Sequence, residues 1–86
     1  MVELAALQDQ IRDFVAKQFL VEFGDDLTDE TDLFDAGVID SYGFIDLVSF
    51  LEKTYGVTLS DDDLASPGMS TLAGIAQMVA SRQSGS

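Results

Sequence analysis

Apolar residues recur at intervals of three and four along three segments of this sequence, and nowhere do they alternate as in a β-strand. Each segment therefore predicts an amphipathic helix, and the three together predict an all-α fold. The first helix is expected from about residue 3 to residue 20, with the apolar residues Leu4, Leu7, Ile11, Phe14, Val15 and Phe19. The second is expected to begin at Ser41, with a core face of Phe44, Leu47, Val48, Leu51 and Tyr55. The last has the stripe Leu72, Ile75, Ala76 and Val79.

Residues that start and stop helices add a short helix between the second and the last. Gly56 is placed to end the second helix in a left-handed conformation. Ser60 and Asp63 have the spacing of a capping box, which predicts that a short helix begins there. Pro67-Gly68 then ends that helix. The predicted fold is a four-helix bundle with three main helices and one short third helix.

The connection between the first two main helices is long for a bundle, at roughly 16 residues from Gly24 to Asp40. We expect this loop to be ordered, because burial of apolar side chains stabilises it by roughly 1.5 to 3 kcal/mol each. The expected anchors are Leu27, Leu33, Phe34, Val38 and Ile39. Gly37 can adopt a positive φ without the cost of a Cβ, so it is expected to turn the chain just before Ser41.

Length and charge limit the classes of protein to which the chain can belong. With 86 residues it is expected to be one domain, residues 1–83, followed by a flexible tail of residues 84–86. The net charge of -12 makes nucleic acid an unfavourable partner, because phosphate repels it. The sequence has no cysteine, no signal-like start and no apolar run of the roughly 20 residues that a membrane span needs. We therefore expect a cytoplasmic, standalone monomer.

The sequence also lacks histidine, which excludes Ser-His-Asp and Cys-His catalytic sets. We therefore expect no catalytic residue and interpret the chain as a substrate of other enzymes. A calcium-binding loop is a rival interpretation, because carboxylates are frequent from Asp25 to Asp35. Its spacing fails: with Asp25 as the first ligand, Glu30 stands where the turn glycine of an EF-hand is needed. No specific metal site is expected.

One segment identifies a function. The run Leu33-Phe34-Asp35-Ala36-Gly37-Val38-Ile39-Asp40-Ser41, followed by an amphipathic helix, resembles the 4′-phosphopantetheine attachment site of acyl and peptidyl carrier proteins. The resemblance extends over most of the chain. It implies that Ser41 carries the arm, which a phosphopantetheinyl transferase attaches from coenzyme A with magnesium. It also implies that Asp40 helps the transferase to orient metal or substrate.

The same resemblance implies that the thiol of the arm carries an acyl or aminoacyl group as a thioester. The partners would then be a loading enzyme and a downstream transferase or synthase. Acidic residues surround Ser41: twelve acids and one base lie between Gly24 and Asp63. An acidic surface with exposed apolar residues suits basic grooves on partner enzymes. The residues expected to bind partners are Tyr42, Ile45, Asp46, Ser49 and Glu52.

Two residues depart from the most familiar fatty-acid carrier pattern. Tyr42 replaces the usual leucine after the serine, and Gly43 replaces a polar or acidic residue. This variant is more similar to discrete carriers of the D-alanyl, aminoacyl or specialised-pathway kind, and the cargo stays open. Phe44 and Phe50 on either side of the second helix either narrow the space between helices or simply fill the core, and core filling is favoured. The alternative function is a non-modified acidic helical adaptor that binds a partner protein, in which Ser41 only caps its helix.

Overall fold

The computed structural model describes residues 3–24 and 27–85. The described chain is helical throughout its regular elements: α1 (Leu4–Phe19), α2 (Ser41–Tyr55), α3 (Asp61–Leu64), the 3₁₀ helix η1 (Pro67–Ser70) and α4 (Leu72–Gly85). This confirms the predicted all-α bundle with three main helices and a short third one. Residues Asp25 and Asp26 of the rejected calcium loop lie outside the described residues. Helix α4 runs to Gly85, so its backbone includes two residues of the expected tail.

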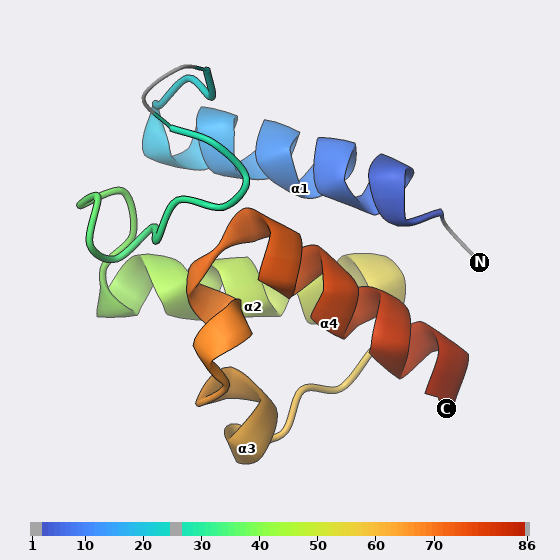
Figure 1. Ribbon diagram of the computed structural model, residues 1–86. Coiled ribbons are helices and arrows are strands. Elements are labelled where there is room, and N and C mark those ends of the chain that lie inside the picture. The colour runs from blue at the N-terminus through green and yellow to red at the C-terminus, as the bar shows by residue number, and fades with distance from the viewer. Residues whose placement is uncertain (1–2, 25–26, 86) are drawn as a thin grey trace.

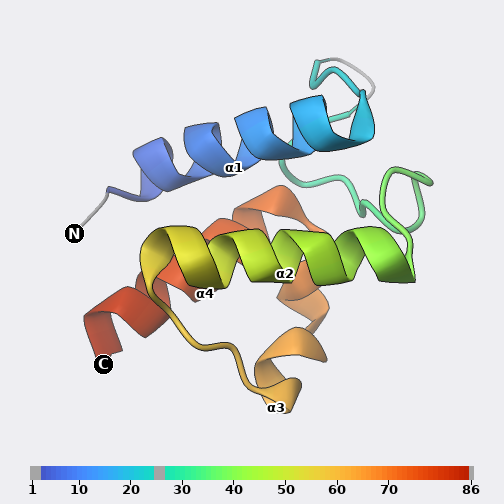
Figure 2. The same cartoon turned by 180° about the vertical axis from the view of Figure 1, so that it is seen from behind.

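The three main helices pack around one core (Figure 1). Helices α1 and α2 run in opposite directions, and the start of α1 and the end of α4 lie at the end of the molecule away from the start of α2 (Figures 1 and 2). The buried residues include most members of the three predicted stripes. The core residues from the main helices are Leu7, Ile11, Val15, Leu47, Leu51, Leu72, Ile75, Ala76 and Val79.

Some predicted core positions are wrong. Leu4 is 39% exposed because it lies in the first turn of α1, beyond the packed part of the helix. Phe34 is 41% exposed, although the sequence indicated a buried anchor. Its ring lies 5.5 Å from that of Phe44, centroid to centroid, on the outside of the bundle. Phe34 therefore belongs to the surface beside the start of α2 and not to the core.

The long loop is ordered where it is described, because both its side chains and its backbone are held. Leu33 is fully buried, its N–H donates to Ser70 O at 2.7 Å, and its carbonyl accepts from the N–H groups of Val38 and Ile39. Gly37 has φ +76°, as predicted, and turns the chain between these bonds. The chain therefore reaches Ser41 from an anchored turn.

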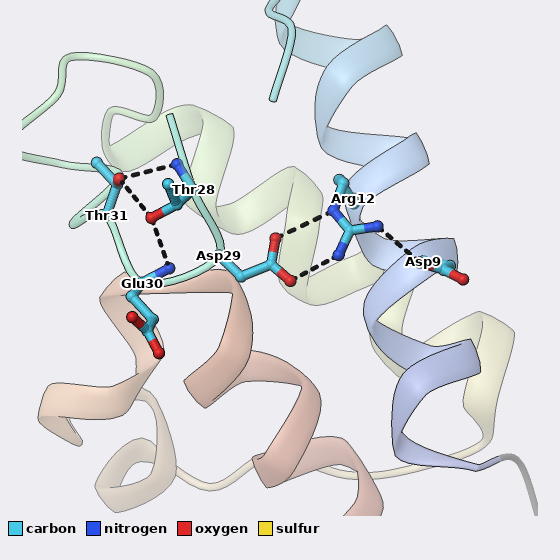
Figure 3. A network of polar contacts seen from close by, with 6 residues as sticks. All are labelled: Asp9, Arg12, Thr28, Asp29, Glu30 and Thr31. Carbon is cyan, nitrogen blue, oxygen red and sulfur yellow. Dashed lines mark hydrogen bonds and ion pairs between the residues drawn. The ribbon is translucent and has the colours of Figure 1, made fainter. Parts of the chain in front are cut away.

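A second attachment holds the earlier part of the loop (Figure 3). The guanidinium of Arg12 in α1 donates to both carboxylate oxygens of Asp29, at 3.0 and 2.6 Å, and to Asp9 at 2.6 Å. The backbone carbonyl of Asp29 accepts from Ala73 N–H at the start of α4. Because such a two-pronged pair is geometrically specific, it fixes the loop relative to both α1 and α4.

Capping residues bound the helices, and those at Gly56 and Ser60 follow the sequence prediction. Gly56 ends α2 with φ +65°. Ser60 and Asp63 form both bonds of the capping box at the start of α3. Thr71 caps α4, because its hydroxyl accepts from Gly74 N–H at 3.1 Å. The 3₁₀ helix η1, which lies between α3 and α4, was not predicted.

Candidate functional site

Ser41 is the first residue of α2 and is exposed. The residue that caps this helix is Asp40, whose carboxylate accepts from Gly43 N–H at 2.8 Å. The rival interpretation, in which Ser41 caps the helix, is therefore wrong, because Asp40 is the capping residue. The hydroxyl of Ser41 stands at the N-terminus of a 15-residue helix, where the helix dipole favours negative charge such as a phosphate.

Gly43, one of the two departures from the familiar carrier pattern, has a packing explanation. A Cβ at Gly43 would lie 2.6 Å from Cε1 of Phe19, closer than real contacts allow. The end of α1 therefore approaches the first turn of α2, and a side chain at position 43 would require the Phe19 ring to shift. Packing against Phe19 is thus an explanation for Gly43 that does not involve the cargo.

The predicted partner-binding residues divide into two groups. Tyr42 and Ile45 are 82% and 64% exposed, and Asp46 is also exposed. Ser49 and Glu52 are half-buried, and Glu52 Oε2 accepts from Leu59 N–H at 3.0 Å. Through this hydrogen bond Glu52 also holds the segment that follows α2.

A groove separates α2 from α3 and has a volume of about 270 Å³. Ile45 and Val48 line it, and they lie about one and two turns after Ser41, so the groove follows the Ser41 side of α2. Leu64 of α3 forms part of its opposite wall. Its full lining is Phe44, Ile45, Val48, Ser49, Glu52 and Leu64. Leu64 was not predicted as a site residue, although it is the only apolar residue of the acidic helix α3.

Phe44 and Phe50 have separate roles in the structure. Phe44 lines the groove beside α3, whereas Phe50 stacks on Phe14 of α1 with ring centroids 4.0 Å apart and an interplanar angle of 11°. Phe50 also lines a second groove of about 450 Å³ between α1 and α2, with Phe14 and Tyr55. The two aromatic residues therefore do not narrow the same space.

Hydrogen bonds keep carboxylates near the site ionised. The ion pair with Arg82, together with Ser60 N–H, lowers the pKa of Asp63 to about 2. The backbone N–H of Asp35 is the main cause of the lowered pKa of Asp32. Both groups are negative at neutral pH. The charge of Asp63 is offset by its ion pair with Arg82, whereas Asp32 adds negative charge to the loop that leads to Ser41.

No group of three or more histidine, cysteine, aspartate or glutamate side chains that could hold a metal ion occurs in residues 3–24 and 27–85. Within the same ranges, no helix is long and apolar enough to cross a membrane. The exposed serine, the surface around it and the α2–α3 groove form the candidate site.

The described chain is a small helical bundle that presents an exposed serine at the start of α2. A family model described as the phosphopantetheine attachment site matches residues 9–79. The match covers most of the chain, so the chain belongs to this family. No curated protein matches the sequence at a significant level.

The family assignment establishes the class of function. The protein is a phosphopantetheine-carrying carrier protein, and 4′-phosphopantetheine is the cofactor that the family carries covalently. Carrier domains of this family are not catalytic, and they interact with the enzymes that modify and load them. The residues at the start of α2 fit this group, because Asp40 caps the helix and leaves the Ser41 hydroxyl exposed.

Proposed function

We propose that Ser41 carries the 4′-phosphopantetheine arm and that the protein transports an acyl or aminoacyl group between partner enzymes. The observation that carries this proposal is the exposure of Ser41 as the first residue of α2, within the segment that matches the family. The anchored turn at Gly37 and the cap at Asp40 support it, because they hold this serine at a fixed point of the surface.

In the attachment step, Ser41 Oγ forms a phosphodiester with the phosphate of the arm. The bond between that phosphate and the nucleotide part of coenzyme A breaks, and the nucleotide leaves. The hydroxyl proton passes to a base of the transferase, because the chain itself has no histidine and Asp40 is engaged in capping. When attached, the arm supplies the thiol that holds the cargo as a thioester. This chain contributes position, exposure and charge.

The surface around Ser41 is proposed to dock the transferase, the loading enzyme and the downstream transferase or synthase. Tyr42 and Ile45 offer exposed apolar contacts, and Asp46 adds charge beside them. This acidic surface would attract partner enzymes that have basic grooves and would speed their encounter with the carrier. Ser49 and Glu52 extend the proposed contact along the α2–α3 groove. Phe34 joins it, since its ring contacts Phe44 at the same end of α2.

The remaining expectations belong to the same proposal. Residues 1–83 would act as a single carrier domain with residues 84–86 as a tail. The protein would work as a cytoplasmic monomer.

The proposal is tested by incubating the unmodified protein with coenzyme A, magnesium and a broad-specificity phosphopantetheinyl transferase. The expected result is a mass gain of one phosphopantetheine, located by peptide fragmentation on the peptide that contains Ser41. Absence of any gain on folded protein would contradict the proposal and favour the adaptor function. A gain located on another serine would contradict the assignment of Ser41 alone.

Replacing Tyr42 or Ile45 by alanine is expected to lower the kcat/KM of arm attachment about tenfold, mainly through KM. The reason is that each change removes an exposed apolar contact and leaves the core intact. Initial rates of attachment at varied carrier concentration measure the effect. Leu4→Ala is the matched control, because it removes a 39% exposed apolar side chain at the other end of the molecule. If the kcat/KM of all three variants equalled that of the wild type, Tyr42 and Ile45 would not belong to the docking surface.

A further inference from the structure

Helix α3 is only four residues long, and two of its side chains link it to the bundle: Leu64 packs against the core, and Asp63 makes polar contacts. Asp63 is 6% exposed, whereas Asp61 and Asp62 face outward. The carboxylate of Asp63 accepts from Ser60 N–H within the capping box, which stabilises the helix but does not attach it to another element. The polar attachment comes from the other contacts of the same carboxylate.

Arg82, in the last part of α4, forms a two-pronged ion pair with Asp63. Its Nε donates to Asp63 Oδ2 at 2.8 Å, and its terminal nitrogen Nη2 donates to Oδ1. The two residues are 19 positions apart in the sequence, so this pair joins α3 to a distant element. Because both hydrogen bonds are charge-assisted and geometrically matched, they specify where α3 lies relative to α4.

The chain on either side of α3 is anchored separately. Before it, Leu59 is buried and its N–H is held by Glu52 of α2. After it, Met69 in η1 is buried. Helix α3 is thus a short bridge between two fixed points, and its own apolar side chain, Leu64, is half-buried in the wall of the α2–α3 groove. Movement of α3 would displace this wall while both anchors stayed in place.

We propose that the Asp63–Arg82 ion pair is a latch that holds α3 against the bundle and thereby sets the width of the α2–α3 groove. Arg82 is then a positioning residue for a surface that it does not line. A partner or cargo that enters the groove contacts Ile45 on α2 and Leu64 on α3. The position of Leu64 is then set by the ion pair between Asp63 and Arg82 of α4. The inference does not depend on modification of Ser41, since every contact in it belongs to the unmodified chain.

Hydrogen exchange of the unmodified protein tests the latch. The N–H groups of Leu64 and Ala65 bond to the carbonyls of Ser60 and Asp61, both at 3.0 Å, and report opening of α3. Arg82→Ala is expected to lower their protection about five- to tenfold, while amides of α2 near Leu51 keep theirs. Arg82→Lys keeps the charge but not the fork, so it should restore only part of the protection.

Lys17→Ala is the matched control, because it also removes one positive charge and breaks an ion pair, the exposed Lys17–Asp13 pair at 3.0 Å. It should leave α3 unchanged. Asp63→Asn provides a second variant, which keeps a side-chain oxygen for Ser60 N–H but loses the charge. Unaltered protection of Leu64 and Ala65 in both Arg82→Ala and Asp63→Asn would overturn the proposal. An equal loss of protection in α2 and α3 would also overturn it, since that pattern indicates global destabilisation.

A fluorescent apolar dye that brightens on entering the groove gives an independent readout. Arg82→Ala should bind the dye more tightly than the wild type, and the added change Leu64→Ala in the same protein should remove the gain. Equal dye affinity for the wild type and Arg82→Ala would show that the latch does not set the groove. Failure of arm attachment at Ser41 would leave all of these measurements intact, so the two proposals fail separately.

Discussion

Replacement of Ser41 by alanine is expected to abolish attachment of the arm completely and to leave the fold intact. The phosphodiester needs the hydroxyl oxygen, and alanine has none. The fold does not need that oxygen, because Ser41 is exposed and Asp40 caps α2. Alanine is also the best helix former, so the change in stability should stay within about 0.5 kcal/mol. Intact mass after incubation with coenzyme A, magnesium and transferase measures attachment, and thermal unfolding measures stability.

Two further variants make the result specific. Ser81→Ala removes an exposed hydroxyl from α4, outside the proposed docking surface, and should be modified as fully as the wild type. Asp40→Asn keeps an oxygen that can accept from Gly43 N–H but removes the charge, so it separates capping from any role in the transferase reaction. Full modification of Ser41→Ala would show that the arm is attached elsewhere.

The helices could be predicted from the sequence because their signals are local. Spacings of three and four place Ile11, Leu47 and Ile75 on buried faces, and these residues are fully buried. The capping box at Ser60 and the positive φ of Gly37 follow from residue chemistry over a few positions. Ser41 was assigned from a flanking pattern that is also continuous in the sequence, and its modification stays a prediction.

The contacts between distant segments could not be predicted in this way. The pairs Arg12–Asp29 and Arg82–Asp63 join residues 17 and 19 positions apart, and a sequence with sixteen acids offers many partners to each arginine. Phe34 was assigned to the core because it is large and apolar, but the turn at Gly37 directs it outward, where it meets Phe44. Burial is decided by the packing of the whole chain, and a single loop residue carries too little signal to reveal it.

Replacement of Gly74 by alanine is expected to destabilise the protein by at least about 3 kcal/mol. A Cβ at Gly74 would lie 1.9 Å from the backbone oxygen of Gly68 and 2.6 Å from its carbonyl carbon. The obstructing atoms are backbone, so no change of side-chain rotamer can relieve the clash. Helix propensity alone would favour alanine over glycine by about 1 kcal/mol. The clash is expected to outweigh this gain, so the free energy of unfolding should fall. Thermal unfolding should show a midpoint lower by roughly 10 to 25 °C for a domain of this size.

The close approach of η1 to α4 matters beyond stability, because Ser70 O of η1 accepts from Leu33 N–H and so holds the loop that leads to Ser41. Gly74→Ala should therefore also slow attachment of the arm in the fraction of protein that stays folded. Gly68→Ala is the sharpest control: a Cβ there would meet Cα of Gly74 at 3.6 Å, an ordinary contact, so the change should be tolerated. Gly24→Ala adds a Cβ with nothing within 4 Å and should be near neutral. An unchanged unfolding temperature for Gly74→Ala would mean that η1 can move away from α4 at no cost. The anchoring of the loop through Ser70 of η1 would then be incorrect.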